Sequence, residues 1–303
     1  MKFERIVLLI SFSMHCILTG CVELDDTLNL YPVDDPDAPA TGLSIKKINT
    51  GIDNFYSLGG INLTGQGFAV FKGVAYRLYN SGLCQTYDIK DLSAPVRISS
   101  FPLGSNRPDN HSNCAQFGID VQGNPLLYVS GLSGKCFVER IRPDGSELVQ
   151  TLTLPALEVF NISSTMNIIC GGDGCLWAFG SALSGQALTF AKLRRPDATE
   201  GDISLTGEDI LDYWTEEGYN YADSVWQGGM VYDGLLYFVF GTNESKRHLA
   251  IYDTATHEKI ADIDLHNVIP EEPEDCDLVD GKILLTINGG TGYYIITHQK
   301  NNE

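Results

Sequence analysis

The chain has 303 residues, of which 39 are acidic and 20 are basic, so its formal net charge at pH 7 is −19. A nucleic-acid backbone would be repelled by this charge, and no basic patch offsets it, so the composition argues against nucleic-acid binding. Glycine is abundant, and aromatic residues make up 10% of the chain. Such a composition favours many short strands joined by tight turns, as in an all-β domain.

Residues 1–20 have the features of a signal peptide. Lys2 and Arg5 give a charged start, and the apolar segment 6–18 is too short to span a bilayer as a helix. The segment ends in the tetrapeptide LTGC, which resembles the lipobox of bacterial lipoproteins. The resemblance implies that the thiol of Cys21 carries a diacylglycerol anchor and that the membrane is a partner. Loss of the leader, which carries Lys2, Arg5 and Glu4, leaves a mature charge of about −20.

Residues 21–42 are acidic, rich in Pro and Asp, and without apolar periodicity. This pattern predicts a flexible tether between the anchor and a folded domain. Glu23, Asp25 and Asp26 follow the cysteine closely and resemble the export signal of Bacteroidetes surface lipoproteins, a group without assigned activity. The resemblance implies an outer-membrane protein that faces the cell exterior.

One motif occurs five times in the remaining chain: a polar residue, a strand, a turn glycine and a second strand. The copies are QGFAVFKGVAYRLYN from Gln66, QFGIDVQGNPLLYVSG from Gln116, NIICGGDGCLWAFG from Asn167, QGGMVYDGLLYFVFG from Gln227 and EDCDLVDGKILLTING from Glu274. A third strand follows each copy, and usually a fourth. Four-stranded antiparallel units at this period predict a β-propeller, since a sandwich requires no fivefold motif and a β-helix coil is far shorter.

The number of blades follows from the ends of the domain. The fifth copy has three strands and then the chain stops, whereas the strand-like segment 43–50 precedes the first copy without partners. If 43–50 supplies the fourth strand of the last blade, the ring closes and no edge stays open. We therefore expect a single domain over 43–303, a five-bladed propeller, and a monomer.

The residue seven positions before each turn glycine is polar in every copy, namely Gln66, Gln116, Asn167, Gln227 and Glu274. Inner strands line the channel of a propeller, so we expect these side chains to ring one end of it. Two interpretations stay open. Either the ring holds water and satisfies the inner strands, or it contacts a ligand.

Loops on the same face supply further candidates for ligand binding, since function on such scaffolds usually lies in loops. They are His111 and Asn113 before the second copy, and Asn243 and Arg247 after the fourth. His111 is either a surface histidine or a base.

The longest interval between copies contains LTGEDILDYWTEEGYNYADSV at 205–225. Thr206 as an N-cap, acids in the first turn and the apolar spacing predict a short helix. Its aromatic residues, Trp214 among them, either pin the helix to the blade or stack against sugar rings.

Six cysteines remain in the mature chain besides Cys21. Cys170 and Cys175 flank a hairpin turn and either form a disulfide or stay free and buried. No histidine cluster or second cysteine pair accompanies them, so we expect no metal site, and no motif indicates a cofactor.

Two classes of function fit these features. The first is a surface binding or adhesion module that recognises a glycan or a protein. The second is an enzyme like the five-bladed glycosidases or lyases, which needs two carboxylates on either side of one bond. Glu274 is the one acid in the ring, and Asp109 and His111 are the other catalytic candidates. Because no opposed partner for Glu274 is evident, we favour binding.

Overall fold

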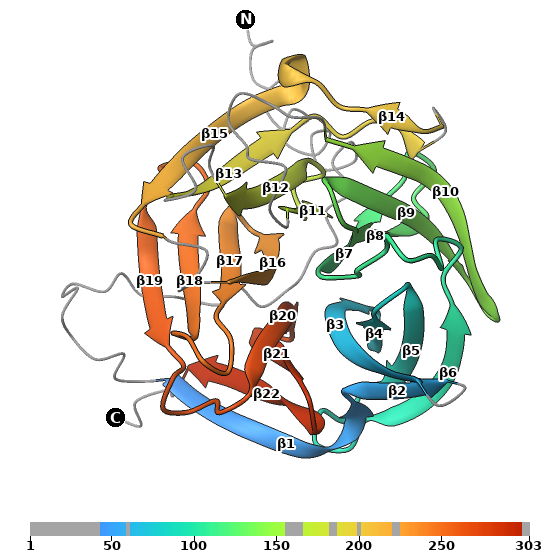
Figure 1. Ribbon diagram of the computed structural model, residues 1–303, viewed down its shortest axis with the longest axis vertical. Helices are drawn as coiled ribbons and strands as arrows, with labels where there is room; N and C mark the ends of the chain where they lie inside the picture. The colour runs from blue at the N-terminus through green and yellow to red at the C-terminus, as the bar shows by residue number, and fades with distance from the viewer. Residues whose placement is uncertain are drawn as a thin grey trace, which may run out of the picture.

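The computed structural model describes residues 43–58, 61–154, 166–181, 187–198, 201–219 and 225–298. These residues form five mainly antiparallel sheets arranged radially around an axis (Figure 1). The predicted all-β, five-bladed propeller is confirmed. The predicted signal peptide, the predicted tether and Cys21 lie outside the described residues. Within the described part, no helix is long and apolar enough to cross a membrane.

Each blade runs from an inner strand at the axis to an outer strand at the rim. Blade 1 contains β3 (Ile61–Phe71), β4 (Val74–Tyr79), β5 (Leu83–Asp88) and β6 (Val96–Pro102), and β2 (Phe55–Leu58) pairs with the start of β3. Blade 2 contains β7 (Ala115–Ile119), β8 (Pro125–Ser130), β9 (Lys135–Arg142) and β10 (Gly145–Thr153), with β14 (Ile203–Ser204) added in parallel.

The next two blades follow the same order. Blade 3 contains β11 (Met166–Cys170), β12 (Leu176–Ser181), β13 (Ala187–Leu193) and β15 (Ile210–Glu217). Blade 4 contains β16 (Trp226–Tyr232), β17 (Leu235–Phe240), β18 (His248–Asp253) and β19 (Lys259–Asp264).

Blade 5 takes its strands from both ends of the described chain. It contains β20 (Glu272–Val279), β21 (Lys282–Asn288), β22 (Thr291–His298) and, outermost, β1 (Leu43–Asp53). β1 pairs antiparallel with β22, so that Ile48 faces Tyr293. The segment predicted to close the ring does so, and Figure 1 shows the blue β1 beside the red strands of blade 5.

The turn residues account for three of the five inner hairpins. In blades 1, 4 and 5 both residues of a two-residue turn have positive φ, namely Lys72-Gly73, Asp233-Gly234 and Asp280-Gly281. This backbone matches the right-handed twist of the strands that it joins. In blades 2 and 3 the connections span 120–124 and 171–175, and the one residue with positive φ in each is Gly123 and Gly174, respectively.

The helix predicted within 205–225 is wrong. Thr206 does cap a turn, but that turn is a single 3-10 element, Gly207–Asp209. The chain then continues as β15, the outer strand of blade 3, in which buried Trp214 lies between exposed Tyr213 and Thr215. Pairing with β13 decides this outcome, because β-branched and aromatic residues fit the pleated surface of a sheet.

Apolar side chains fill the spaces between neighbouring blades. The cluster between blades 3 and 4 is aromatic, with Trp177, Phe190 and Phe238 fully buried. The cluster between blades 5 and 1 includes Phe68 and Leu284. Because each sheet is covered by its neighbours, the closed ring leaves the inner strands as a rigid frame for polar groups at the axis.

Candidate functional site

The five matched polar residues all lie on inner strands, and all are buried. Gln116 and Asn167 have no exposed surface, while Gln66, Gln227 and Glu274 expose 5%, 4% and 2%. Most of their hydrogen-bonding capacity is therefore available to the protein rather than to solvent.

In blades 1, 4 and 5 the matched residue sits in a β-bulge of the inner strand, near the point where its pairing with the second strand begins. The register against the second strand shifts around Gln66, Gln227 and Glu274. A bulge adds one residue to a strand and re-aims its side chain. These three residues, together with Glu272 and Asn288, form what we call the mouth.

Gln116 and Asn167 occupy regularly paired positions instead. The five residues were matched by counting seven positions back from the turn glycine. In blades 2 and 3 the connection between the two strands is longer, so the same count reaches a residue nearer to the hairpin end of the inner strand. The Gln116 amide bonds both the N–H and the carbonyl of Val231 in blade 4. Asn167 donates to the carbonyl of Gln227. These two amides hold inner strands together, and the expectation that all five positions are equivalent is wrong.

Asp275 is a buried carboxylate that joins blades at the axis. Its Oδ2 accepts hydrogen bonds from the N–H of Phe68 in blade 1 at 2.8 Å and of Ala115 in blade 2 at 3.0 Å. Gly228 of blade 4 lies so close that a Cβ there would be 2.0 Å from Oδ1. Burial raises the pKa of Asp275 well above its ordinary value. Asp275 therefore fastens three blades, and only glycine fits opposite it.

Arg77 on β4 is fully buried between blades 1 and 5. Its guanidinium donates to the carbonyl of Gln66, to Thr286 Oγ1 at 3.0 Å and to the carbonyl of Ile287 at 2.8 Å. Its Nε has no hydrogen-bond partner among the described residues. Burial lowers the pKa of Arg77, and the charge of nearby Glu274 opposes that shift.

Glu272 is a mouth carboxylate that the sequence reasoning missed. Its Oε1 accepts a hydrogen bond from Gln227 Nε2 at 2.8 Å, and its Oε2 one from Asn288 Nδ2 at 3.4 Å. Glu272 is partly exposed, and burial raises its pKa while the two amides oppose the rise. The available signal was its place two residues before Glu274 at the start of the same strand.

Glu274 is almost fully buried, and its carboxyl is shifted toward the protonated form. Burial first, and then the charge of Glu272, raise the pKa of Glu274 well above its ordinary value, whereas Arg77 lowers it. A carboxyl of raised pKa can serve as a general acid. Glu272 and Glu274 share one strand, however, and the other four matched positions are amides. The matched ring therefore supplies no pair of carboxylates on opposite sides of a bond.

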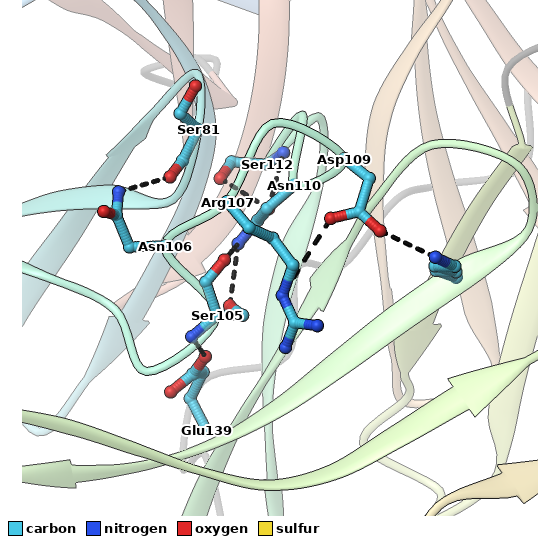
Figure 2. Close-up of polar contacts among 9 residues, drawn as sticks. Ser81, Ser105, Asn106, Arg107, Asp109, Asn110, Ser112 and Glu139 are labelled. Atoms are coloured by element: carbon cyan, nitrogen blue, oxygen red, sulfur yellow. Dashed lines mark hydrogen bonds and ion pairs between the residues drawn. The ribbon is translucent and has the colours of Figure 1, made fainter.

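The loop between blades 1 and 2 is held by its own side chains, as Figure 2 shows. Asn110 donates to Ser105 Oγ at 2.8 Å and accepts from the N–H of Ser112 at 3.0 Å. Glu139 of β9 accepts from the N–H of Ser105 at 2.8 Å. The loop is thus fixed before any ligand arrives.

Asp109 in this loop forms ion pairs with Lys135 at 2.6 Å and with Arg107 at 3.9 Å (Figure 2). The hydrogen bond from Lys135 lowers the pKa of Asp109, so the carboxylate stays ionised. His111 is half-buried, and burial lowers its pKa, which favours the neutral ring. Asn113 is buried and donates to Asn167 Oδ1 at 3.0 Å, which links blades 2 and 3.

Arg247 and Asn243 lie together in a loop of blade 4. Arg247 exposes only 5% of its surface and donates to the carbonyls of Thr242, Asn243 and Pro270. It therefore fastens the loop, whereas the Asn243 side chain is exposed.

Trp214 does not offer an exposed face for a sugar. It is 9% exposed and stacks between Phe190 at 4.9 Å and His257 at 4.6 Å, measured between ring centroids. Of the two interpretations of this aromatic residue, the structure supports packing within the blade interface. Trp214 thus packs the segment after Thr206 against the blade as the strand β15 rather than as a helix.

Cys170 and Cys175 are free thiols, so the hairpin disulfide is not formed. Cys170 is buried, accepts a hydrogen bond from Arg195 at 3.4 Å, and has its pKa raised to about 11 by burial. In the described part of the chain, no three His, Cys, Asp or Glu side chains are grouped as metal ligands.

Comparison with solved structures places the fold beside glycoside hydrolases. The exo-β-1,3-galactanase of Phanerochaete chrysosporium, solved with galactose, matches with a TM-score of 0.51 and 8% identity over 85% of this chain and 65% of that chain. An alanine variant of that enzyme with β-1,3-galactotriose gives 0.50 and 8% over 84% and 64%. The chain thus spans slightly less than two thirds of these structures. No family model and no curated sequence matches it.

Proposed function

We propose that this protein binds a neutral glycan at the mouth and does not hydrolyse it. The observation that carries the proposal is the composition of the mouth, which holds the amides of Gln66, Gln227 and Asn288 and two acids, Glu272 and Glu274, that share one strand. Hydrolysis of a glycosidic bond needs carboxyl groups on both sides of that bond. Amides and one partly exposed carboxylate instead supply directional hydrogen bonds to sugar hydroxyls.

The mouth is organised before a ligand arrives. Gln227 and Asn288 both donate to Glu272, which leaves that carboxylate oriented and partly open to solvent. In blade 1, Thr64 Oγ1 accepts from Asn80 at 2.8 Å and from Gln66 at 3.3 Å. Fixed donors and acceptors reduce the entropy lost on binding. The likeness of the fold to exo-β-1,3-galactanases supports a saccharide as the ligand class.

The test is calorimetric titration of the full chain with β-1,3-galactotriose and a panel of other neutral oligosaccharides. We expect at least one ligand, weakened about tenfold or more by Glu272→Gln and by Gln227→Ala, since each change removes a hydrogen bond involving a charged group. Leu211→Ala is the matched control, because Leu211 is 51% exposed on the outer strand of blade 3. Equal affinities of wild type and Glu272→Gln would contradict the proposal.

The alternative function is hydrolysis through the same mouth. The raised pKa of Glu272, caused by burial, is what favours it, since a general acid requires such a shift. Reducing ends that accumulate with the wild type and not with Glu272→Gln would establish this alternative.

The membrane anchor is a further part of the proposal. The charged start, the apolar segment and the LTGC box support lipidation of Cys21, and Glu23, Asp25 and Asp26 support an outer location. We expect palmitate labelling of the full chain to disappear with Cys21→Ala, and protease added to intact cells to digest the domain. Sedimentation of the detergent-solubilised chain is expected to give a monomer.

A further inference from the structure

A cavity of about 540 Å³ lies in blade 1, and none of the mouth residues lines it. It is lined by the end of β1, by β2 and by the outer strands β5 and β6. Its volume falls in the range of small-molecule sites, roughly 300–1,000 Å³.

Gln85 forms the buried wall of this cavity and is 3% exposed. One end of its amide is held by two phenols: Oε1 contacts the hydroxyl of Tyr79 at 2.8 Å and that of Tyr87. The other end, Nε2, has no hydrogen-bond partner among the described residues. This nitrogen is not enclosed by the protein, so it stays accessible from the cavity that Gln85 lines. The free end of Gln85 therefore marks where a polar ligand atom would sit.

Asp53 and Arg97 form the charged part of the wall. Asp53 Oδ2 lies 3.6 Å from Arg97 Nη1, and both side chains are about half exposed. The same two tyrosines position Asp53, because Tyr87 accepts its N–H at 3.1 Å and Tyr79 donates to its carbonyl at 2.6 Å. At this separation most donors of the guanidinium and most lone pairs of the carboxylate are free for a ligand.

The remaining lining combines hydroxyl groups with aromatic faces. Ser99 and Ser100 come from β6, and Phe55 and Tyr56 come from β2. Phe55 is 46% exposed, and an exposed aromatic face complements the C–H groups of a sugar ring.

We infer that this blade 1 cavity is a second saccharide site, which takes one neutral hexopyranose with free vicinal hydroxyls. Asp53 accepts from two adjacent hydroxyls, Arg97 and the free end of Gln85 bond further oxygens, and Phe55 covers the ring. The Asp53–Arg97 pair has no net charge, and the formal charge of −19 on the chain disfavours an anionic sugar.

The site shares no lining residue with the mouth, although the two are neighbours, since Phe55 pairs with Thr64, two residues before Gln66. The mouth carboxylates lie on β20, whereas Arg97 lies on β6. Glu272→Gln and Arg97→Gln therefore change different sites.

The test is saturation-transfer NMR and calorimetry of the full chain with D-galactose, D-glucose, D-mannose and D-glucuronate. At least one neutral hexose is expected to bind, and Arg97→Gln and Phe55→Ala are each expected to weaken it about tenfold. Ile98→Ala is the matched control, because Ile98 is 57% exposed beside Arg97 and does not line the cavity. Circular dichroism verifies that each variant is folded.

Glu272→Gln separates this site from the mouth. Unchanged hexose binding in Glu272→Gln together with loss in Arg97→Gln supports the blade 1 cavity, even if the mouth binds nothing. Three results would overturn the inference: no neutral hexose binds, Arg97→Gln binds as the wild type does, or D-glucuronate binds more tightly than every neutral hexose.

Discussion

The interface between blades 3 and 4 and the interface between blades 5 and 1 solve the same packing problem with different chemistry. Between blades 3 and 4, Phe190 lies 4.9 Å from Trp214, 5.4 Å from Phe238 and 5.0 Å from Tyr252, measured between ring centroids. Aromatic rings combine a large buried area with loose directional demands. The interface between blades 3 and 4 therefore depends on the volume and shape of its side chains rather than on hydrogen bonds between them.

Between blades 5 and 1, polar groups enter the interface beside the apolar cluster. Arg77 reaches the backbone of β21, Glu274 lies near it, and Gln85 continues the same side of blade 1 outward, opposite Arg77 in the strand register. Each buried polar group needs a partner at the correct distance, or it costs free energy. Both proposed sites adjoin this interface, so the interface that tolerates substitution least is also the one at which we propose ligand binding.

Removal of an aromatic ring between blades 3 and 4 is expected to have the largest effect. Phe190→Ala leaves a cavity among fully buried rings and should lower the free energy of unfolding by about 4 kcal/mol. Urea denaturation measures the change. Val96→Ala, at an exposed residue of β6, is the control and should change stability by less than about 0.5 kcal/mol.

Removal of the buried charge between blades 5 and 1 is expected to have the next largest effect. Arg77→Met keeps the length of the side chain but leaves the carbonyls of Gln66 and Ile287 without this donor, and Glu274 without its compensating charge. The free energy of unfolding should fall by about 3 kcal/mol in urea denaturation. An unchanged denaturation midpoint would mean that the hydrogen bonds of Arg77 between blades 5 and 1 do not contribute to stability.

Asp277, a buried carboxylate on β20 like Asp275, should make stability depend on pH. Burial raises the pKa of Asp277 to about 7, so the folded state binds a proton that the unfolded state releases near pH 4. Its contribution is therefore full below the unfolded pKa and is lost as pH rises, by about 2 kcal/mol between pH 5 and pH 7. Asp277→Asn should remove this slope in denaturation experiments at the two pH values. His111 has the opposite sign, since its lowered pKa favours folding at higher pH, so the difference between wild type and variant is the quantity to compare.

Reduction should have the smallest effect. Because Cys170 and Cys175 are free, dithiothreitol should leave the melting temperature of the chain unchanged. A drop on reduction that Cys175→Ser abolishes would show a disulfide across the blade 3 hairpin.

The sequence predicted the ring because its signals are local. Asp233-Gly234 and the alternation around it specify a hairpin wherever they occur, and an unpartnered strand at 43–50 can be matched to a blade that lacks one. The outer strand of blade 3 was missed because Thr206 and its acids form a real cap. Only pairing with β13, a long-range contact, turns the following residues into a strand.

The candidate site was less predictable. Gln66, Gln227 and Glu274 were found because their three blades have inner hairpins with turns of equal length. Counting seven residues back from the turn glycine therefore reaches the same structural position in each of these blades. Gln116 and Asn167 were misplaced because longer connections shift the count. Glu272 is marked in the sequence only by its place two residues before Glu274. Gln85 carries no local signal, since its importance depends on Tyr79, which another strand brings to it.

The central claim is that the mouth binds a neutral glycan without cleaving it. The most direct measurement is mass spectrometry of the best-binding oligosaccharide after prolonged incubation with the full chain, beside its affinity for wild type and Glu272→Gln. We predict an intact oligosaccharide in both cases and weaker binding to Glu272→Gln. Shortened products with the wild type that are missing with Glu272→Gln would contradict the claim and identify a hydrolase.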